Sequence, residues 1–389
     1  MSEHGMKGPI AERAYQICTH CIMDTTDPEI TFNAEGICNH CQSFEVNSRK
    51  WWFPNDEGQK RLGDVLEKIK REGRGKEYDC IIGLSGGVDS SYAAYIVKKL
   101  GLRPLAVHFD SGWNSELAVK NIEGIIKKLE IDLYTVVCDW EEMRDIQLSF
   151  FKASVANCDI PQDHTFIAAL YQVAIKKKIR YLISGNNMAT EAVLPQAWGY
   201  TSEDRVHLES IQKRFGTIKL RKLPRYNLFQ YFFYYPYVKR IKQINILNYM
   251  PYDKGKAKSF LIGELGWRDY GGKHCESKFT RFFQTYYLPV KFGYDKRRAH
   301  LSSLIVSGQI TRKEALREME KPLFVEDEIR EDKEFVAKKL GLTLKGFEDI
   351  IALPKRTYRD YPSSERVIRL RINAGIWVRK VLTRIGWKI

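Results

Sequence analysis

A short glycine-rich segment, residues 85–90 with the sequence SGGVDS, combines residue types that suit phosphate binding. The apolar residues Cys80–Leu84 precede it and predict a buried strand, and the residues up to Leu100 have the apolar spacing of a helix. A strand that turns through glycines into a helix presents unpaired backbone N–H groups to an anion. Gly86 and Gly87 let the backbone approach closely, and the serine hydroxyls add donors. The segment therefore predicts a phosphate-binding loop.

Asp89 is the unexpected member of this loop, because a carboxylate repels phosphate unless a cation such as Mg²⁺ lies between them. No Gly-Lys-Ser/Thr follows, so the segment is not a Walker A loop. We expect catalytic roles for Ser85, Asp89 and Ser90. The residues expected to bind the nucleotide here are Ser85, Gly86, Gly87, Val88, Asp89 and Ser90. The alternative is an ordinary glycine turn between a strand and a helix.

Two CxxC pairs lie near the N-terminus, at Cys18, Cys21, Cys38 and Cys41. Each pair lets one tight turn aim two thiolates at a single ion, and two such turns complete a tetrahedral zinc site. A four-thiolate site has no open position, so we expect a structural role. His20 and His40 lie inside the pairs and are not expected as ligands. An iron–sulfur cluster is the alternative occupant.

Length and charge limit the classes of protein to consider. The chain has 389 residues, which predicts two or three domains, and 44% of them are hydrophobic, enough for a core. No apolar run reaches the roughly 18 residues of a membrane-spanning helix, and the start lacks a signal-peptide pattern, so we expect a cytoplasmic protein. The net charge of +15 suits an acidic partner: nucleic acid, a nucleotide or an anionic membrane surface.

Strands and helices alternate through the middle of the chain. Beyond the loop, the pattern predicts strands at Pro104–Phe109, Asp132–Val137 and Tyr181–Ser184, and helices at Ser115–Leu129, Trp140–Ser154 and Phe166–Lys177. This alternation indicates an α/β fold with a parallel sheet and right-handed crossovers. Ligands bind beyond the carboxyl ends of such strands. The polar clusters at 85–90, 110–114 and 184–187 are therefore expected at one edge of the sheet.

Other polar residues near this edge are candidates with open alternatives. The connector at 157–164 is expected to be an active-site loop, although Asp163 could cap the following helix. Glu191 could hold Mg²⁺ or face solvent.

The chain divides into three expected domains: a Cys₄ zinc module at 1–60, a nucleotide domain at 61–200 and a mostly helical substrate- or partner-binding region at 201–389. The aromatic-rich run Tyr226–Tyr237 is interpreted as helical core rather than a stacking platform, and Val238–Tyr249 as a continuing helix. From about Ser364 the spacing predicts a basic terminal helix. That helix either packs on its own domain or contacts anionic lipid.

The segment 266–304 is dense in basic residues, and its charge suits the two phosphates of a nucleotide sugar. Its aromatic residues have helical spacing and predict an apolar helix face made of Phe279, Phe282, Phe283, Tyr286 and Tyr287. We expect Lys273 and His274 to be catalytic. Residues expected to bind the substrate are Asn114, His164, Glu276, Arg281, Lys296, Arg297 and Arg298.

Several of these segments together resemble the N-acetyl sugar amidotransferases of the ATP pyrophosphatase (PP-loop) superfamily. They are the CxxC pairs, SGGVDS, and residues 110–123, 266–284 and 292–305, and the resemblance spans about residues 15–355. It implies an enzyme of bacterial lipopolysaccharide O-antigen or flagellin-sugar biosynthesis. Such an enzyme converts the acetamido group of a nucleotide-activated sugar, here a UDP-sugar, to an acetamidino group and releases AMP and pyrophosphate.

The resemblance also implies roles for two further strand ends. The second, with His108 and Asp110, would lie near adenine and ribose. The fourth, with Gly185 and Asn186, would lie near the reacting phosphate. The alternatives are that Asp110 caps the end of its strand and that Gly185, Asn186 and Asn187 form a plain turn.

The source of ammonia is expected to be a second protein. No cysteine follows Met1, and no glutaminase signature surrounds the other cysteines. The resemblance implies a separate glutaminase subunit with a cyclase-like partner that delivers ammonia, and no nucleic acid partner. The oligomeric state stays open, with a homodimer among the options.

Two other functions remain as alternatives. A tRNA thiolase would need a sulfur-carrying thiol or cluster, and the cysteines outside the CxxC pairs are Cys80, Cys138, Cys158 and Cys275. A non-catalytic nucleotide-binding scaffold would use the same loop without turnover.

Overall fold

The computed structural model describes residues 14–271 and 277–371 of the chain. Its centre is a five-stranded parallel sheet with the strand order β3-β2-β1-β4-β5. The strands are β1 (Cys80–Gly83), β2 (Pro104–Asp110), β3 (Asp132–Val137), β4 (Tyr181–Ser184) and β5 (Lys242–Asn245). The predicted α/β class is confirmed, and the four strands expected from the sequence are present within one residue of their predicted bounds.

Helices cover both faces of the sheet, because successive strand residues point to opposite sides. On β1, Cys80 and Ile82 pack into one apolar cluster, and Ile81 packs into another on the opposite face. The first face is covered by α2 (Asp56–Glu72), α3 (Val88–Lys99), α4 (Glu116–Leu129) and α9 (Lys254–Leu265). The second face is covered by α6 (Ile160–Lys176) and the π-helix η1 (Gln230–Val238).

Two sequence expectations were wrong in this region. The predicted helix over Val238–Tyr249 is instead β5, followed by the 3₁₀-helix η2 (Ile246–Tyr249). β5 gains its strand conformation from pairing with β4, which periodicity does not reveal. Much of the expected loop at 157–164 is helical, because α6 starts at Ile160 with Pro161 in its first turn.

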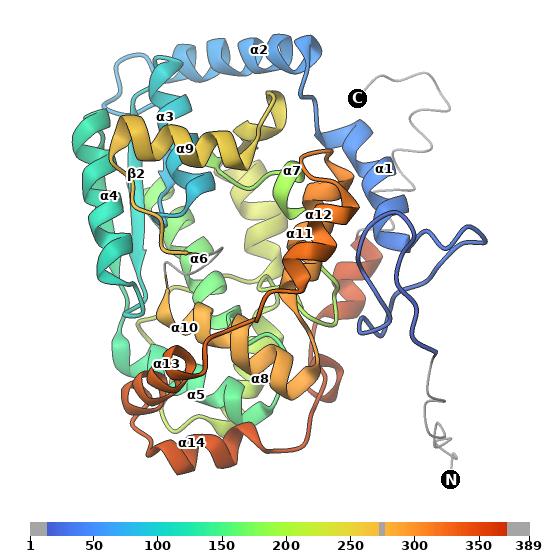
Figure 1. The fold of residues 1–389 in the computed structure, drawn as a ribbon. Helices are drawn as coiled ribbons and strands as arrows, with labels where there is room; N and C mark the ends of the chain where they lie inside the picture. The colour runs from blue at the N-terminus through green and yellow to red at the C-terminus, as the bar shows by residue number, and fades with distance from the viewer. Residues whose placement is uncertain (1–13, 272–276, 372–389) are drawn as a thin grey trace.

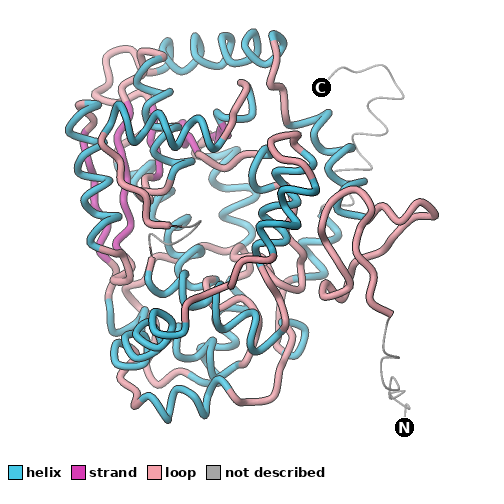
Figure 2. Tube along the Cα trace, viewed as in Figure 1, coloured by secondary structure: helices cyan, strands magenta, loops and turns pink. Residues whose placement is uncertain are grey.

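A second helical body lies below the sheet domain in Figure 1. Figure 2 shows that the strands gather in one part of the molecule, away from this body. Its elements are α5 (Trp140–Ala153), α8 (Arg205–Phe215), α10 (Lys278–Phe282), the π-helix η3 (Phe283–Phe292), α13 (Glu326–Lys339) and α14 (Leu344–Ile351). Its core is aromatic, with Phe279, Phe282, Phe283 and Tyr287 fully buried, as their helical spacing predicted.

The N-terminal module packs on the side of the molecule. After α1 (Asn39–Trp51), the Phe53 N–H donates to the Asn248 carbonyl and the Phe53 ring stacks on Tyr249. The remaining elements are α7 (Met188–Glu191), α11 (Lys296–Val306), α12 (Arg312–Met319) and the 3₁₀-helix η4 (Tyr358–Asp360). Among the described residues, no helix has the length and apolar character needed to cross a membrane.

Candidate active site

The SGGVDS loop joins β1 to α3 at the point where the strand order reverses, since β2 and β4 lie on opposite sides of β1. Its two serines are tied together, with 3.1 Å between the Ser85 and Ser90 hydroxyl oxygens. The Gly87 N–H donates to Ser85 Oγ at 3.3 Å. Gly86 has a φ of +85°, which favours glycine, and an added Cβ would lie 2.9 Å from the Ala118 carbonyl oxygen. The loop therefore holds a compact turn of small donors at the start of a helix.

Asp89 faces two side chains that come from a distant part of the sequence. The Tyr252 hydroxyl donates to Oδ1, and Lys254 Nζ lies 3.5 Å from Oδ2. The pKa of Tyr252 is raised well above its usual value, first by burial and then by the Asp89 charge. Glu191 contributes to the same shift, so its carboxylate also acts on this phenol. The loop carboxylate thus lies in a polar cluster rather than in open solvent.

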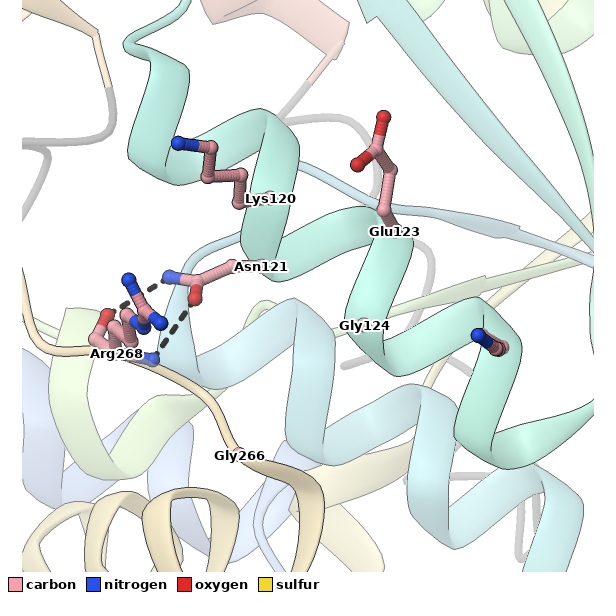
Figure 3. A pocket seen from close by; sticks show the side chains of 7 residues that line it. Lys120, Asn121, Glu123, Gly124, Gly266 and Arg268 are labelled. Carbon is pink, nitrogen blue, oxygen red and sulfur yellow. Dashed lines mark hydrogen bonds between the residues drawn. The ribbon is translucent and has the colours of Figure 1, made fainter.

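The segment 266–271 holds the loop from the other side. Trp267 Nε1 donates to the Gly86 carbonyl at 2.8 Å, and the Tyr270 hydroxyl donates to the same oxygen at 3.3 Å. The Asn121 side chain on α4 exchanges two hydrogen bonds of 2.8 Å with the Arg268 backbone. Figure 3 shows this pair beside a surface pocket of about 310 Å³. The pocket is lined by Lys120, Asn121, Glu123, Gly124, Lys127, Gly266 and Arg268.

The end of β2 forms a connected group of polar side chains. His108 Nδ1–H donates to the Leu84 carbonyl at 3.0 Å, and Asn114 Nδ2 donates to His108 Nε2 at 3.1 Å. These partners assign the neutral Nδ1–H tautomer to the imidazole. Asn114 Nδ2 also donates to Asp110 Oδ1 at 3.2 Å. The structure therefore brings His108, Asp110 and Asn114 together next to the loop.

A second cavity, of about 200 Å³, lies at the ends of β2 and β3. It is lined by Asp110, Gly112, Val137, Cys138, Trp140 and Lys339. Lys339 reaches it from α13, where its ammonium lies over the Trp140 ring and donates to the Gly112 carbonyl. Burial is the main reason that the pKa of Lys339 is lowered.

The end of β4 packs directly against the start of α3. A Cβ on Gly185 would lie 2.7 Å from the Asp89 carbonyl oxygen, so this position leaves no room for a side chain. The Asn186 N–H donates to its neighbour Ser184 Oγ. Gly185 and Asn186 therefore lie beside the loop, as expected for the fourth strand end.

His164 lies apart from this cluster. It is fully buried in α6, where Nδ1–H donates to the Ser202 carbonyl at 2.7 Å and Nε2 accepts the Tyr226 N–H at 3.3 Å. Its ring stacks on Tyr226, and burial lowers its pKa to about 4. With both ring nitrogens bonded to backbone, the side chain presents no free polar atom to a substrate.

Three arginines that are expected to bind the substrate form ion pairs within the protein. Arg281 forms a two-point ion pair with the buried Asp332 carboxylate of α13, at 2.7 and 2.5 Å. Arg297 pairs with Asp295 at the start of its own helix. Arg298 reaches the N-terminal module, with Nε 3.1 Å from Asp24 Oδ2 and Nη1 3.0 Å from the Ile22 carbonyl. These contacts stabilise the junctions between elements.

Four other predicted residues complete the set. Lys296 lies with its ammonium 5.7 Å from the Phe283 ring centroid. Lys273, His274 and Glu276 lie outside the described residues. Their predicted roles stay predictions.

The four cysteines of the CxxC pairs converge as expected. Their sulfur atoms all lie within 4.8 Å of one another, and the neighbouring Sγ–Sγ distances are 3.6, 3.6 and 3.9 Å. Backbone N–H groups of Cys21 and Cys38 point at Cys18 Sγ. Arg312 of α12 donates to the Cys18 and Cys21 carbonyls and so fixes the module on α12. The cluster suits a metal ion or an iron–sulfur cluster.

Sequence reasoning missed Tyr252 and Lys254 as neighbours of the loop. Tyr252 lies in the short connection between η2 and α9, Lys254 is the first residue of α9, and only the Met250-Pro251 break marked that position. Trp267 and Tyr270 lay in a segment that was singled out, but their contact with Gly86 could not be read from spacing.

Two separate segments of the chain match known protein families. Residues 60–217 match the NAD synthase family. Residues 276–374 match the C-terminal domain of WbpG-like lipopolysaccharide (LPS) biosynthesis proteins. None of the curated proteins compared with the chain matches it.

Solved structures with local similarity are distant. The NH₃-dependent NAD synthetase from Campylobacter jejuni shares 16% identity, with a TM-score of 0.28, 40% of this chain covered and 72% of that chain. The NMN synthetase from Francisella tularensis shares 19% identity, with a TM-score of 0.29 and coverage of 55% and 87%. The U34-tRNA thiolase NcsA from Methanococcus maripaludis, with its [4Fe-4S] cluster, shares 15% identity, with a TM-score of 0.33 and coverage of 80% and 91%.

The two family matches agree with the architecture. The first covers β1 to β4 with the SGGVDS loop, and the second covers the helices that follow residue 276. The first indicates a synthetase-type enzyme that uses ATP, and the second names the biosynthetic class. The chain therefore joins a segment similar to the NAD synthases to a segment similar to the C-terminal domain of WbpG-like LPS biosynthesis proteins.

Proposed function

We propose that the chain is an ATP-dependent amidotransferase that converts the acetamido group of a nucleotide-activated sugar, a UDP-sugar, into an acetamidino group. The acetamido oxygen attacks the α-phosphorus of ATP, and pyrophosphate leaves with the electron pair of the broken P–O bond. Ammonia then adds to the carbon of the adenylated imidate, AMP leaves, and loss of a proton completes the amidine. The ammonia comes from a separate glutaminase.

One observation carries this proposal: the WbpG-like segment is joined to the nucleotide strand ends. Ser277 forms a backbone bridge with Asn114, and the Lys278 N–H donates to the Trp113 carbonyl at 3.2 Å. Asn114 in turn contacts His108 and Asp110. An acceptor group held by this segment would therefore lie beside a nucleotide bound at the loop.

The loop supplies the means to stabilise the leaving pyrophosphate. Backbone N–H groups at the start of α3 and the Ser85 and Ser90 hydroxyls form a fixed set of donors. Donors that are already in place as charge develops typically contribute a factor of about 10²–10³ in rate. Lys254, 3.5 Å from Asp89, adds a cation to the same region.

The residues around Asp89 also fit Mg²⁺. Asp89 and Glu191 offer carboxylates near the same phenol, and Mg²⁺ prefers one or two carboxylates together with substrate phosphates. Bound there, the ion would neutralise charge on the phosphates.

The 200 Å³ cavity is our candidate for the adenine base. Trp140 and Val137 provide apolar walls, and Asp110 lies at its edge. The lysine that enters it, Lys339, comes from α13 of the C-terminal region, so base binding would also involve that region.

Zinc is the proposed occupant of the four-cysteine cluster. With Zn–S bonds of about 2.3 Å, a tetrahedral site has sulfur–sulfur edges of about 3.8 Å. Three of the six sulfur–sulfur edges, at 3.6, 3.6 and 3.9 Å, agree with this value, and all six lie within 4.8 Å. The four thiolates of an iron–sulfur cluster are divided among two or four iron atoms, so as a set they stand further apart than thiolates around one ion.

Outside the CxxC pairs, the described thiols give little support to a tRNA thiolase that carries sulfur on a cysteine. Burial raises the pKa of Cys138 to about 12 and raises those of Cys80 and Cys158 further above the usual value. A sulfur carrier needs an accessible thiolate. We therefore keep the amidotransferase as the proposal.

Mass spectrometry of candidate UDP-sugars after incubation with ATP, Mg²⁺ and an ammonium salt tests the reaction. The expected product is about one mass unit lighter, because NH replaces oxygen, and AMP appears only when both sugar and ammonia are present. Glutamine should fail as nitrogen source for this chain alone and succeed when the glutaminase is added. AMP release with tRNA and a sulfur donor would point to thiolation instead, and nucleotide binding without AMP release from any acceptor would point to a scaffold.

A further inference from the structure

The π-helix η1 exposes a stripe of aromatic rings. Phe229, Phe233 and Tyr237 follow one another at four-residue steps and are 63%, 50% and 70% exposed. Their rings contact one another in sequence, with centroids 5.2 and 5.8 Å apart. The opposite side of the same helix is core, since Tyr235 is buried and stacks on Tyr171 of α6. The prediction that the whole aromatic run is core was therefore wrong for these three residues, the aromatic stripe.

A second exposed apolar segment lies beside this helix. Residues 365–371 are helical, and the Arg371 guanidinium lies 3.5 Å from the centroid of the Phe232 ring. The charge of Arg371 also acts on Tyr231 and Glu203. Within this segment Val367 and Leu370 are 58% and 68% exposed. Apolar side chains that gather on a surface commonly mark an interaction site.

The surroundings of the aromatic stripe are strongly basic. No Asp or Glu occurs between Ser210 and Tyr252. The basic residues of that stretch are Lys213, Arg214, Lys219, Arg221, Lys222, Arg225, Lys239, Arg240 and Lys242. Two of them pair with acids elsewhere, Lys222 with Asp139 and Arg225 with Glu209.

Positive charge is concentrated most at the end of η1. Arg240 and Lys242 are exposed, and so is Arg366 on the neighbouring segment, where Arg369 pairs with Glu365. The pKa of Lys242 is lowered, first by the nearby Lys68 ammonium, so like charges already crowd this surface. An anionic partner would relieve that repulsion.

We propose that the aromatic stripe and its basic surroundings dock on an anionic lipid surface. Aromatic rings of this type insert at the boundary between headgroups and acyl chains, and basic side chains around them attract anionic headgroups. A protein partner or a second copy of this chain would also cover apolar rings. The excess of exposed lysine and arginine over acidic residues on this surface favours an anionic layer over either.

The candidate active site stays accessible when the aromatic stripe is docked on a lipid surface. η1 leads into the amino end of β5, whereas the SGGVDS loop lies at the carboxyl end of β1, and all five strands are parallel. Docking through η1 would therefore leave the opposite edge of the sheet open to soluble substrates. The proposal is independent of the reaction assigned to the loop.

Sedimentation of the full chain with lipid vesicles at low salt tests the proposal. We expect binding to vesicles that contain phosphatidylglycerol and little binding to pure phosphatidylcholine vesicles. The variant F229A/F233A/Y237A should lose tenfold or more in partitioning. The variant R240Q/K242Q should lose about fivefold for each charge removed. As a matched control, V290A/V325A removes apolar side chains that are equally exposed elsewhere, and it should bind like the wild type.

Folding and self-association are measured in parallel. Thermal melts establish that each variant is folded. If the aromatic variant is unstable, the charge variant still tests the proposal, because it leaves the apolar packing untouched. The proposal is overturned if the wild type ignores phosphatidylglycerol, or if folded stripe and charge variants bind as well as the wild type. It is also overturned if vesicle binding is absent and light scattering shows that the wild type is a dimer whereas the stripe variant is a monomer.

Discussion

Asp89 defines the chemistry of the site through the groups that surround it. A carboxylate in a phosphate-binding turn would ordinarily weaken anion binding, but Tyr252 donates to it and Lys254 lies 3.5 Å away. Both partners lie more than 160 residues further along the chain. The carboxylate is thereby held at the helix start, where it can share a cation with phosphates.

Replacing this carboxylate tests its role. Asp89→Asn keeps the shape and removes the charge, so we expect AMP formation to fall by a factor of about 10²–10³ while the melting temperature changes little. Ser85→Ala should act in the same direction. Glu116→Gln, in the first turn of the neighbouring helix α4, is the matched control and should keep wild-type turnover. Wild-type activity in a folded Asp89→Asn enzyme would remove Asp89 from the mechanism.

His164 makes stability depend on pH. Its folded-state pKa of about 4 lies below the usual value of about 6.5, because burial opposes the charged ring. Below pH 6.5 the unfolded chain binds a proton that the folded chain does not. The stabilisation is therefore complete above pH 6.5 and is lost as the pH falls towards 4, by about 3 kcal/mol.

Urea unfolding across this pH range measures the effect. The His164→Gln variant has no charge to gain, so its free energy of unfolding should fall less steeply than that of the wild type between pH 6.5 and 4. Equal slopes for the two proteins would mean that His164 is not held neutral by the fold.

At the scale of elements, the segment after α9 acts as a clamp on the loop. Gly266 ends α9 in the left-handed conformation, and the chain then turns so that Trp267 and Tyr270 reach the Gly86 carbonyl. Asn121 fixes the same segment to α4. The segment after α9, which Asn121 ties to α4, thus supports the loop and keeps its donors in place.

Trp267→Phe removes the indole N–H and keeps most of the apolar ring. Losing one buried hydrogen bond costs about 1–3 kcal/mol, so the KM for ATP should rise by about tenfold or more while the fold persists. Trp198→Phe is the matched control, because Trp198 is equally buried and its Nε1 has no partner among the described residues. If both variants raise the KM alike, the clamp is not what positions the loop.

At the scale of the whole molecule, the cysteine module is attached to α11 and α12 by specific contacts. Arg298 and Arg312 bind carbonyls of the two-cysteine turn at 18–22, and Arg298 also pairs with the buried Asp24. The Ile22 N–H donates to Ser302 of α11. Metal binding in the module should therefore stabilise the surface on which it rests.

Cys41→Ser should lose the metal and unfold the module, since structural zinc sites contribute about 10–16 kcal/mol of binding energy. Elemental analysis should find one zinc per wild-type chain and none in the variant. Cys158→Ser changes a buried thiol outside the cluster and should keep the metal. An iron chromophore in the wild type would show that the module holds an iron–sulfur cluster rather than zinc.

Local features of the sequence were sufficient for much of the fold. The SGGVDS turn, the first four strands and the convergence of four cysteines all depend on neighbouring residues, whose spacing sets backbone conformation directly. The buried face of Phe279, Phe282, Phe283 and Tyr287 followed from helical periodicity for the same reason.

Only the tertiary structure decided which distant residues contact those local features. β5 exists because β4 offers an open edge, and Tyr252 reaches Asp89 only after the chain has crossed the sheet. Arg281 and Arg298 have the charge of substrate ligands, yet each pairs with a buried carboxylate from a distant element. Such pairings depend on which surfaces pack against each other, and residue type and spacing do not predict that packing.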